Sequence, residues 1–394
     1  MGVLNPGLHR VARTQMRPFS GAGATTQSPD FTLLAVSLAL TLFGLVMVAS
    51  SSAPAAYATY QHPEQLFVKQ LIAAIVGLVL LFLFSRLDYR KLFAYDGILM
   101  IVAISVTFLT LIPALAPGGL WLRLGGFSFQ PTEFAKFALL IFLAASLVRK
   151  SESGEIRDFM HGIVPFFVLF GVLAVLAIAQ PDFAMVIEYG ALLAFMLIIG
   201  GARLIHLAAP TLPCIPVFFA LIMTSEYRRD RLLTFLNPFS DPDGRGYHLI
   251  QSLTALGSGG LLGRGLGASR EKWLYLPSAY NDFILSVVGE ELGLIGLLLI
   301  LSLFIIFAWR GLQIALDAPD RFGFFLAAGI TFSITFQAAI NFGVTTGVLP
   351  VTGLTLPLVS YGGTSLIISL AMIGILLNIS RSTQAARAKG ARLL

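Results

Sequence analysis

The carboxylates in this sequence that could take part in catalysis stand at the edges of long apolar runs. Asp282 follows the polar stretch SAYN and precedes an apolar run that begins FILSVVG. A carboxylate at the rim of a cavity can accept a proton from an attacking hydroxyl, although an aspartate before a helix can equally be a capping residue. Glu290 and Glu291 follow on one helix, where adjacent side chains point about 100° apart. We therefore expect the two carboxylates to have different partners, and an arginine or backbone N–H groups could bind one of them.

A second group of polar residues lies in WLRLGGFSFQPTEFAKFALL. Glu133 and Lys136 are three residues apart, so they share one helical face and can form an ion pair. Upstream, Trp121 and Arg123 could anchor the chain at a membrane interface or bind a phosphorylated lipid headgroup. Farther along, Gln-Pro-Asp at 180–182 predicts a tight turn between two apolar runs.

The composition is that of a membrane protein. Hydrophobic residues make up 57% and charged residues 12% of the 394 residues, and soluble domains carry about twice that charged fraction. Continuous apolar runs, rather than alternating ones, exclude a barrel. We therefore predict an all-α, polytopic integral membrane protein with about ten transmembrane helices, at 31–50, 66–85, 95–115, 132–148, 160–179, 183–200, 204–223, 283–308, 322–342 and 364–380.

Basic residues predict the orientation of these spans. The net charge is +6, and Lys and Arg gather in alternate loops and in both tails, so both termini are expected in the cytoplasm. This role in topology argues against nucleic-acid binding. We expect a tail at 1–30, one transmembrane domain at 31–380 that begins with a retained span rather than a signal peptide, and a second tail at 381–394.

Three loops then share the outer side: 116–131, 344–362 and the largest, the extracytoplasmic loop 224–282 between spans seven and eight. Its glycines, aromatics and charges of both signs argue for order, and GSGGLLGRGLG at 257–267 predicts a close backbone approach or a re-entrant turn. The segment 344–362 is apolar but broken by Gly and Pro, which predicts a re-entrant or cavity-lining stretch or a buried loop. Cys214, the single cysteine, is expected to be a buried apolar residue.

No pattern of metal-binding residues or of a nucleophilic triad is present in the sequence. No Cys-x-x-Cys spacing is present, no His-x-Glu pattern suggests a metal, and no Ser/His/Asp set is evident. The sequence identifies no certain cofactor. Carboxylates on the outer side could hold a divalent cation together with lipid phosphates.

The chain carries four ordered motifs: WLRLGGFSFQPTEFAK, AQPDFA, GYHLIQSLTALGSGGLLGRGLGASREKWLYLPSAYNDFILSVVGEELG and PVTGLTLPLVSYGGTSLI. Together they resemble the SEDS family of bacterial shape, elongation, division and sporulation proteins, which includes FtsW and RodA. The resemblance extends over about residues 30–382, and GRGLGASREKWLYLP is closer to the FtsW branch.

This resemblance implies a peptidoglycan glycosyltransferase of the cytoplasmic (inner) membrane that polymerises lipid II at the outer face during cell division. It also implies a class B penicillin-binding protein as partner, other divisome membrane proteins, and a location at the septum. The family's essential acidic residue falls on Asp282, which we expect to be the general base. Candidate substrate-binding residues are Trp121, Arg123, Glu133, Lys136, Gln251, Lys272, Ser360 and Thr364. Arg123, Lys136, Lys272 and the arginines after span seven are the candidates for binding phosphate.

Two other functions stay open. A flippase of the same lipid would need charges along the whole membrane path, whereas the charges here gather at span ends and in the outer half. A non-catalytic divisome scaffold would tolerate the loss of Asp282 but not of its partner surface. The chain also departs from the family pattern, with Tyr280-Asn281 where His-Thr is usual and Ala184 where Gly is usual, so a role for an imidazole beside the carboxylate is in doubt.

Overall fold

The structure is a computed structural model, and it describes residues 28–391 except 125, 126, 243, 245 and 274. Helices make up most of this part of the chain, and its strands form one antiparallel hairpin of β1 (Leu122–Leu124) and β2 (Phe127–Phe129). The predicted all-α class is therefore confirmed. Most of the predicted N-terminal tail and the side chain of Cys214 lie outside the described residues.

Each of the ten predicted spans falls on a helix. Eight described helices are long and apolar enough to cross a membrane, if α6 is counted together with the helical turn Phe159–Ile163 before it, whereas α7 and the apolar part of α8, Leu204–Pro213, are shorter. The helices are α2 (Phe31–Tyr60), α3 (Gln65–Arg86), α4 (Lys91–Leu109), α5 (Pro131–Ser153), α6 (Val164–Ala179), α7 (Phe183–Ile199), α8 (Leu204–Met223), α11 (Ile284–Leu316), α12 (Arg321–Thr345) and α13 (Gly363–Ala391).

Helices α2 and α13 extend farthest beyond their predicted ends. Helix α2 continues past residue 50 to Tyr60, and α13 continues past residue 380 to Ala391, so the segment predicted as a C-terminal tail begins as helix. Alanines in both extensions favour helix. The predicted ends marked where the apolar runs stop, but a helix can continue through polar residues once it has left the hydrocarbon.

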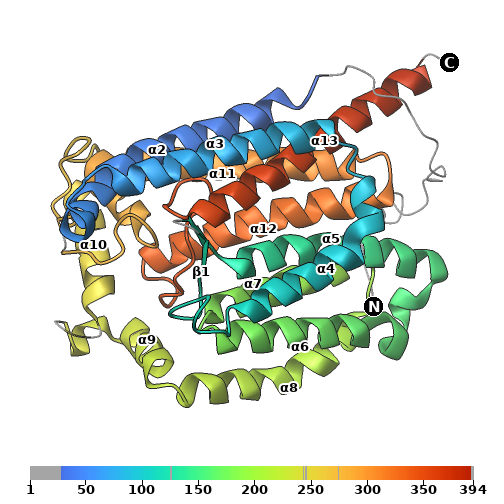
Figure 1. Cartoon of the computed structure of the whole chain (residues 1–394), viewed down its shortest axis with the longest axis horizontal. Coiled ribbons are helices and arrows are strands. Elements are labelled where there is room, and N and C mark those ends of the chain that lie inside the picture. Colours follow the sequence, from blue (N-terminus) through green and yellow to red (C-terminus); the bar gives the residue numbers. More distant parts are fainter. Residues whose placement is uncertain (1–27, 125–126, 243, 245, 274, 392–394) are drawn as a thin grey trace, which may run out of the picture.

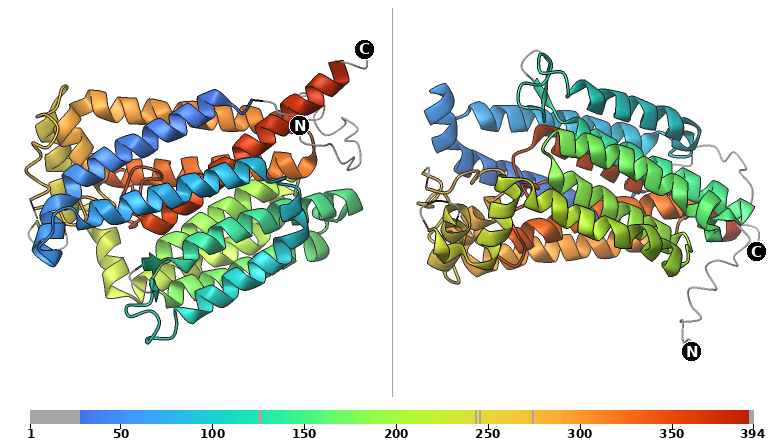
Figure 2. Two further views of the ribbon diagram at one scale, coloured as in Figure 1. Left: turned by 45° about the horizontal axis from the view of Figure 1, so that its top comes forward. Right: turned by 90° about the horizontal axis from the view of Figure 1, so that it is seen from below.

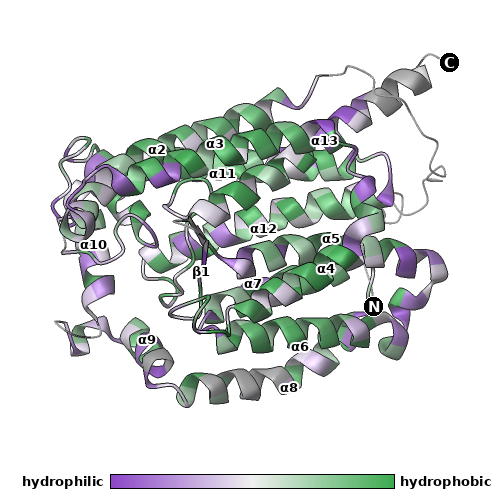
Figure 3. Ribbon diagram, in the orientation of Figure 1, coloured by the Kyte–Doolittle hydropathy of each residue, from purple (hydrophilic) through white to green (hydrophobic). Residues whose placement is uncertain are grey.

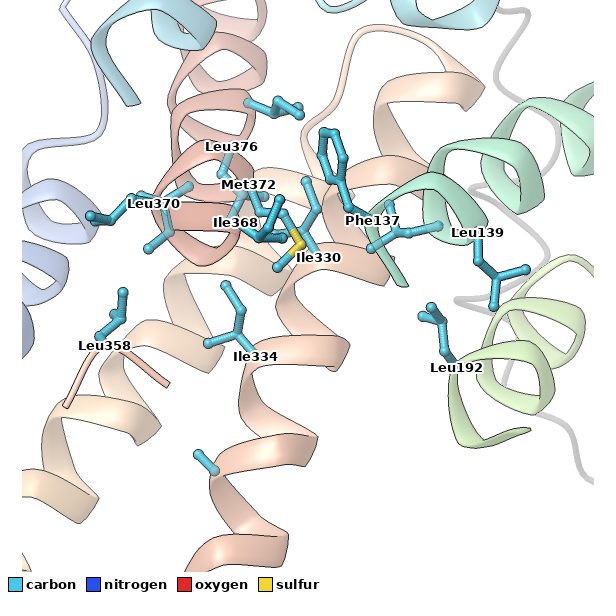
Figure 4. Close-up of a cluster of buried hydrophobic side chains, with 14 of the residues drawn as sticks. Phe137, Leu139, Leu192, Ile330, Ile334, Leu358, Ile368, Leu370, Met372 and Leu376 are labelled. Atoms are coloured by element: carbon cyan, nitrogen blue, oxygen red, sulfur yellow. The ribbon is translucent and has the colours of Figure 1, made fainter. Parts of the chain in front are cut away.

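Helices α5 and α13 lie at the centre of the bundle (Figures 1 and 2). In each of them 89% of the apolar stretch is buried, whereas only 22% is buried in α4 and 28% in α11. Hydrophobic colour runs along the bundle and hydrophilic colour gathers towards its ends (Figure 3), as a lipid-embedded protein requires. Side chains such as Phe137, Ile334 and Met372 join α5, α12 and α13 in the core (Figure 4).

The polar loops meet at one end of the bundle. The hairpin β1–β2, the long loop before α11 and the turn between α2 and α3 lie at the left in Figure 1, opposite the end of α13. The long loop is ordered around α9 (Glu226–Leu236) and α10 (Tyr247–Gly259), as predicted. The segment 344–362 also lies at this end, since Ser360 bonds the carbonyl of Asn281 in the long loop. The three loops predicted to lie together thus meet at one end, and its extracytoplasmic side stays a prediction.

Glycines let α10 and the loop after it lie against α11. A Cβ on Gly259 would be 1.9 Å from the carbonyl oxygen of Gly289, and one on Gly263, where φ is +78°, would be 2.2 Å from that of Glu291. Backbone bonds follow from this approach, with the Arg264 amide donating to the Glu290 carbonyl at 3.0 Å. The predicted close backbone approach at 257–267 is confirmed.

Two glycines of α10 provide a matched test of this contact. Gly259→Ala should lower the free energy of unfolding by about 1–3 kcal/mol, because the new methyl group would push α10 off α11. Gly257→Ala adds the same methyl in the same helix to open space and should be neutral or stabilising by up to about 1 kcal/mol. Thermal unfolding in detergent would measure both, and an equal response of the two variants would contradict the packing described here.

Candidate active site

Asp282 lies two residues before α11, at the end of the bundle where the loops meet. Its side chain is half-buried, and its Oδ1 has no hydrogen-bond partner among the described residues. Gly353 faces it, since a Cβ there would lie 3.7 Å from Oδ2. A partly buried carboxylate with an unpaired oxygen is suited to take a proton from a bound molecule.

The backbone around Asp282 is held by the irregular segment 350–361, between α12 and α13. The Asn341 side chain donates from Nδ2 to the carbonyls of Asp282 (2.9 Å) and Leu354 (2.7 Å). Ser360 donates from Oγ to the Asn281 carbonyl at 2.7 Å and accepts from the Leu356 amide at 2.9 Å. Residues 356–360 of the predicted segment 344–362 are buried, and Gly353 borders the Asp282 carboxylate, as expected for a cavity-lining stretch or a buried loop. The segment 350–361 thus forms one wall of the site.

Burial sets the proton affinity of Asp282. Loss of solvent around the carboxyl raises its pKa from 3.8 to about 6, and the charge of Arg231 opposes this rise. Arg231 extends from α9 and donates to the Val351 carbonyl at 3.2 Å. The long loop therefore places a guanidinium near the carboxylate, and Asp282 is predominantly charged at neutral pH.

A second part of the site joins the start of α5 to the start of α7. Asp182 accepts from Nε2 of Gln130 at 3.1 Å and from Oγ1 of Thr132 at 2.9 Å. The Oγ1 of Thr364, at the start of α13, accepts from the Gln130 amide at 3.1 Å. The Gln-Pro-Asp turn at 180–182 therefore also anchors the helix that carries Glu133 and Lys136.

Lys136 lies at the centre of a buried charge cluster. Its Nζ is 2.8 Å from Glu133, which confirms the predicted pair, and 3.0 Å from Glu188 of α7. It also donates to Gln337 of α12 at 2.9 Å, and Gln337 donates in turn to the Thr355 carbonyl of segment 350–361. The cluster is thereby connected to the wall of the Asp282 site.

Glu290 and Glu291 fix the long loop onto α11, and they do so through different partners, as predicted. Glu290 accepts from Arg264 at 3.1 Å and from the Arg270 amide at 3.0 Å. Glu291 pairs with Lys272 at 2.8 Å and accepts from Ser50 at 2.8 Å.

The candidate phosphate-binding lysines are both engaged within the protein. Lys272 also donates to Ser50 and to the Gly267 carbonyl, and Lys136 meets three acceptors. An ammonium group has three donors, so either lysine would have to release a partner to bind phosphate. Arg123, by contrast, is exposed on β1.

The other predicted site residues divide between the centre and the periphery. Ser360 and Thr364 are buried close to the wall described above, whereas Trp121 and Gln251 are half-buried, on the hairpin approach and on α10. Sequence reasoning missed Glu188, Gln337 and Asn341. Each is a polar residue inside an apolar run, and that signal alone could have marked them.

The described residues contain no group of three or more His, Cys, Asp or Glu side chains that could hold a metal ion. A divalent cation at this end of the bundle would therefore be held by fewer than three such side chains, with water or phosphate oxygens of a bound substrate completing its ligands.

Known proteins resemble the chain along most of its length. The family model described as "Cell cycle protein" (FtsW/RodA/SpoVE) matches residues 31–385. The "Probable peptidoglycan glycosyltransferase FtsW" of Geobacter metallireducens is 40% identical over 355 residues, which cover 89% of this chain and 94% of that protein. "Stage V sporulation protein E" of Bacillus subtilis is 40% identical over 360 residues, 90% of this chain and 97% of that protein.

Solved structures share the fold. A chain from "Structural coordination of polymerization and crosslinking by a peptidoglycan synthase complex" superposes with a TM-score of 0.72 at 28% identity, over 90% of this chain and 98% of that one. The rod shape determining protein RodA of Thermus thermophilus gives a TM-score of 0.66 at 26% identity, over 91% of this chain and 98% of RodA.

Proposed function

The chain belongs to the FtsW/RodA/SpoVE family of cell cycle proteins, and on this premise we propose that it is a peptidoglycan glycosyltransferase that polymerises lipid II. It is a multi-pass membrane protein, and its relatives carry the name of that activity. The observation that carries the proposal is Asp282, a half-buried carboxylate with an unpaired oxygen, held at the bundle end where the loops meet.

Asp282 serves as the general base in this mechanism. A sugar hydroxyl of one substrate attacks the anomeric carbon of another, and the bond from that carbon to the lipid diphosphate breaks. The hydroxyl proton passes to Asp282, and the polyprenyl diphosphate leaves with its negative charge. Arg231 and the exposed Arg123 are two of the guanidinium groups at this end that can stabilise that charge.

The proposed base predicts the pH dependence of the reaction. Asp282 must be charged to accept a proton, and its pKa is raised to about 6 by burial. The kcat/KM for lipid II should therefore rise about tenfold per pH unit below that value and level off above it. A profile measured from pH 4.5 to 8 would test this, and a rate that is flat from pH 4.5 to 7 would contradict the assignment.

The proposed partner is a class B penicillin-binding protein, which would supply the transpeptidase. One structural relative was solved under a description that names a peptidoglycan synthase complex coordinating polymerisation and crosslinking. We place both termini in the cytoplasm and the protein at the septum, together with other divisome membrane proteins. The site would then face the outer side of the inner membrane, where lipid II is consumed.

The direct test is polymerisation of lipid II by the purified protein, alone and with its class B partner. Glycan strands resolved on a gel are expected from the complex. Two further assays address the other candidate functions: transport of lipid II across vesicles for a flippase, and partner binding without polymer for a scaffold. Transport in the absence of any polymer would replace the proposed function.

A further inference from the structure

Three tyrosines from distant parts of the chain lie at the end of the bundle that holds Asp282, near enough for Tyr60 to act electrostatically on the other two and for Asp282 to act on Tyr280. Tyr60 is the last residue of α2, Tyr280 precedes Asp282 by two residues, and Tyr361 ends the segment 350–361. The rings of Tyr280 and Tyr361 meet edge to face, with centroids 5.6 Å apart and planes at 74°. Lys69 of α3 lies over the Tyr60 ring, 4.9 Å from its centroid.

The backbone of this cluster is fixed in place. The Tyr361 amide donates to the Tyr280 carbonyl at 3.0 Å. Gln70, buried on α3, donates to the Ser360 carbonyl at 3.0 Å and accepts from the Gly362 amide at 3.1 Å. Tyr361 is thus held from both sides. Tyr60 is 39% exposed, so the cluster presents an accessible aromatic face on a rigid base.

The phenol groups are close enough to affect one another electrostatically. Burial raises the pKa of Tyr361 to about 12, and Tyr60 and Tyr280 add to the rise. Burial likewise raises the pKa of Tyr280, with further contributions from Tyr60 and Asp282. The hydroxyls of Tyr280 and Tyr361 are therefore protonated near neutral pH and can donate hydrogen bonds.

We propose that Tyr60, Tyr280 and Tyr361 form a saccharide-binding surface that positions the sugar part of the lipid-linked substrate against Asp282. The inference rests on the proposed function and adds a binding site to it. Aromatic faces can cover the apolar C–H face of a sugar ring while the phenols bond its hydroxyls. A polyprenyl chain would be a poor ligand here, because it would desolvate an ammonium, a carboxylate and three hydroxyls without bonding them.

Two tyrosines one helical turn apart on α2 provide the test. Tyr57 is 58% exposed and Tyr60 is 39% exposed, so Tyr57→Leu is a matched control for Tyr60→Leu. Both are made in an Asp282→Asn background, where binding is measured without turnover. The probes are lipid II and undecaprenyl diphosphate, which carries the same lipid and diphosphate but no sugar.

Tyr60→Leu should raise the Kd for lipid II about tenfold, equivalent to ~1.4 kcal/mol, and leave the Kd for undecaprenyl diphosphate unchanged. Tyr57→Leu should change neither. If Tyr60→Leu raised the Kd of both ligands equally, the Tyr60 ring would contact the lipid or the diphosphate, and the proposal would be wrong. An unchanged Kd for both ligands would also overturn it. If the wild-type protein binds lipid II but forms no glycan, the proposed function is wrong. The comparison of Tyr60→Leu with Tyr57→Leu still tests the saccharide-binding surface in that case, because it measures binding alone.

Discussion

Asp282→Asn is expected to reduce lipid II polymerisation by at least about 100-fold, because the amide cannot accept the proton of the attacking hydroxyl. The substitution keeps the size of the side chain and leaves the backbone carbonyl that Asn341 binds. Binding of the class B partner should therefore be unchanged. Strand formation by the complex, quantified on gels from labelled lipid II, is the measurement.

Stability provides the control for this variant. The pKa of Asp282 is raised from 3.8 to about 6 in the folded protein, so the folded state binds the proton more tightly than the unfolded state. Rising pH therefore removes stability between those two values, and above pH 6 the charged carboxylate carries the whole penalty. Asp282→Asn should thus unfold at the same or a higher temperature at pH 7.5. Full activity in a folded variant would assign the base elsewhere, with Glu133 the next residue to test.

Lys136→Met should have the largest effect on stability. It would leave Glu133 and Glu188, which are 3% and 1% exposed, without the ammonium that lies within 3.0 Å of both. Breaking a buried pair from one side costs about 3–5 kcal/mol, since a buried charge is left uncompensated. The unfolding temperature in detergent and the yield of membrane-inserted protein should both fall sharply.

A charge-balanced variant separates charge from packing in this cluster. Lys136→Met combined with Glu133→Gln and Glu188→Gln removes all three charges while keeping similar volumes, and much of the lost stability should return. The polymerisation activity of this triple variant would then show whether the cluster also positions Thr355 through Gln337. An unfolding temperature unaffected by Lys136→Met alone would contradict the buried arrangement.

The sequence predicted the parts of the site that depend on local spacing. Glu133 and Lys136 lie three residues apart on one helix, and this spacing is sufficient to bring them together. Glu290 and Glu291 are adjacent, so their side chains must diverge, and the structure gives them different partners. At Asp282, the position before an apolar helix allowed a base or only a capping residue, and the resemblance to the SEDS family favoured the base.

The partners of isolated polar residues could not be predicted in the same way. Glu188, Gln337 and Asn341 each stand alone in an apolar run, and helical periodicity does not say which neighbouring helix their side chains will face. The packing of α5, α7 and α12 makes Glu188 and Gln337 ligands of Lys136. From the sequence, Lys272 is expected to be a cation in a loop. In the structure the glycines bring this loop close to α11, so Lys272 is buried against Glu291.

The sequence by itself therefore determined the membrane class, the helical spans and the polar loops, because burial in hydrocarbon constrains every residue of a span separately. Only the tertiary structure decided which loops meet around Asp282, which charges neutralise one another, and which tyrosines share a surface. These contacts join residues far apart in the chain, and their free energy depends on the path of the backbone between them.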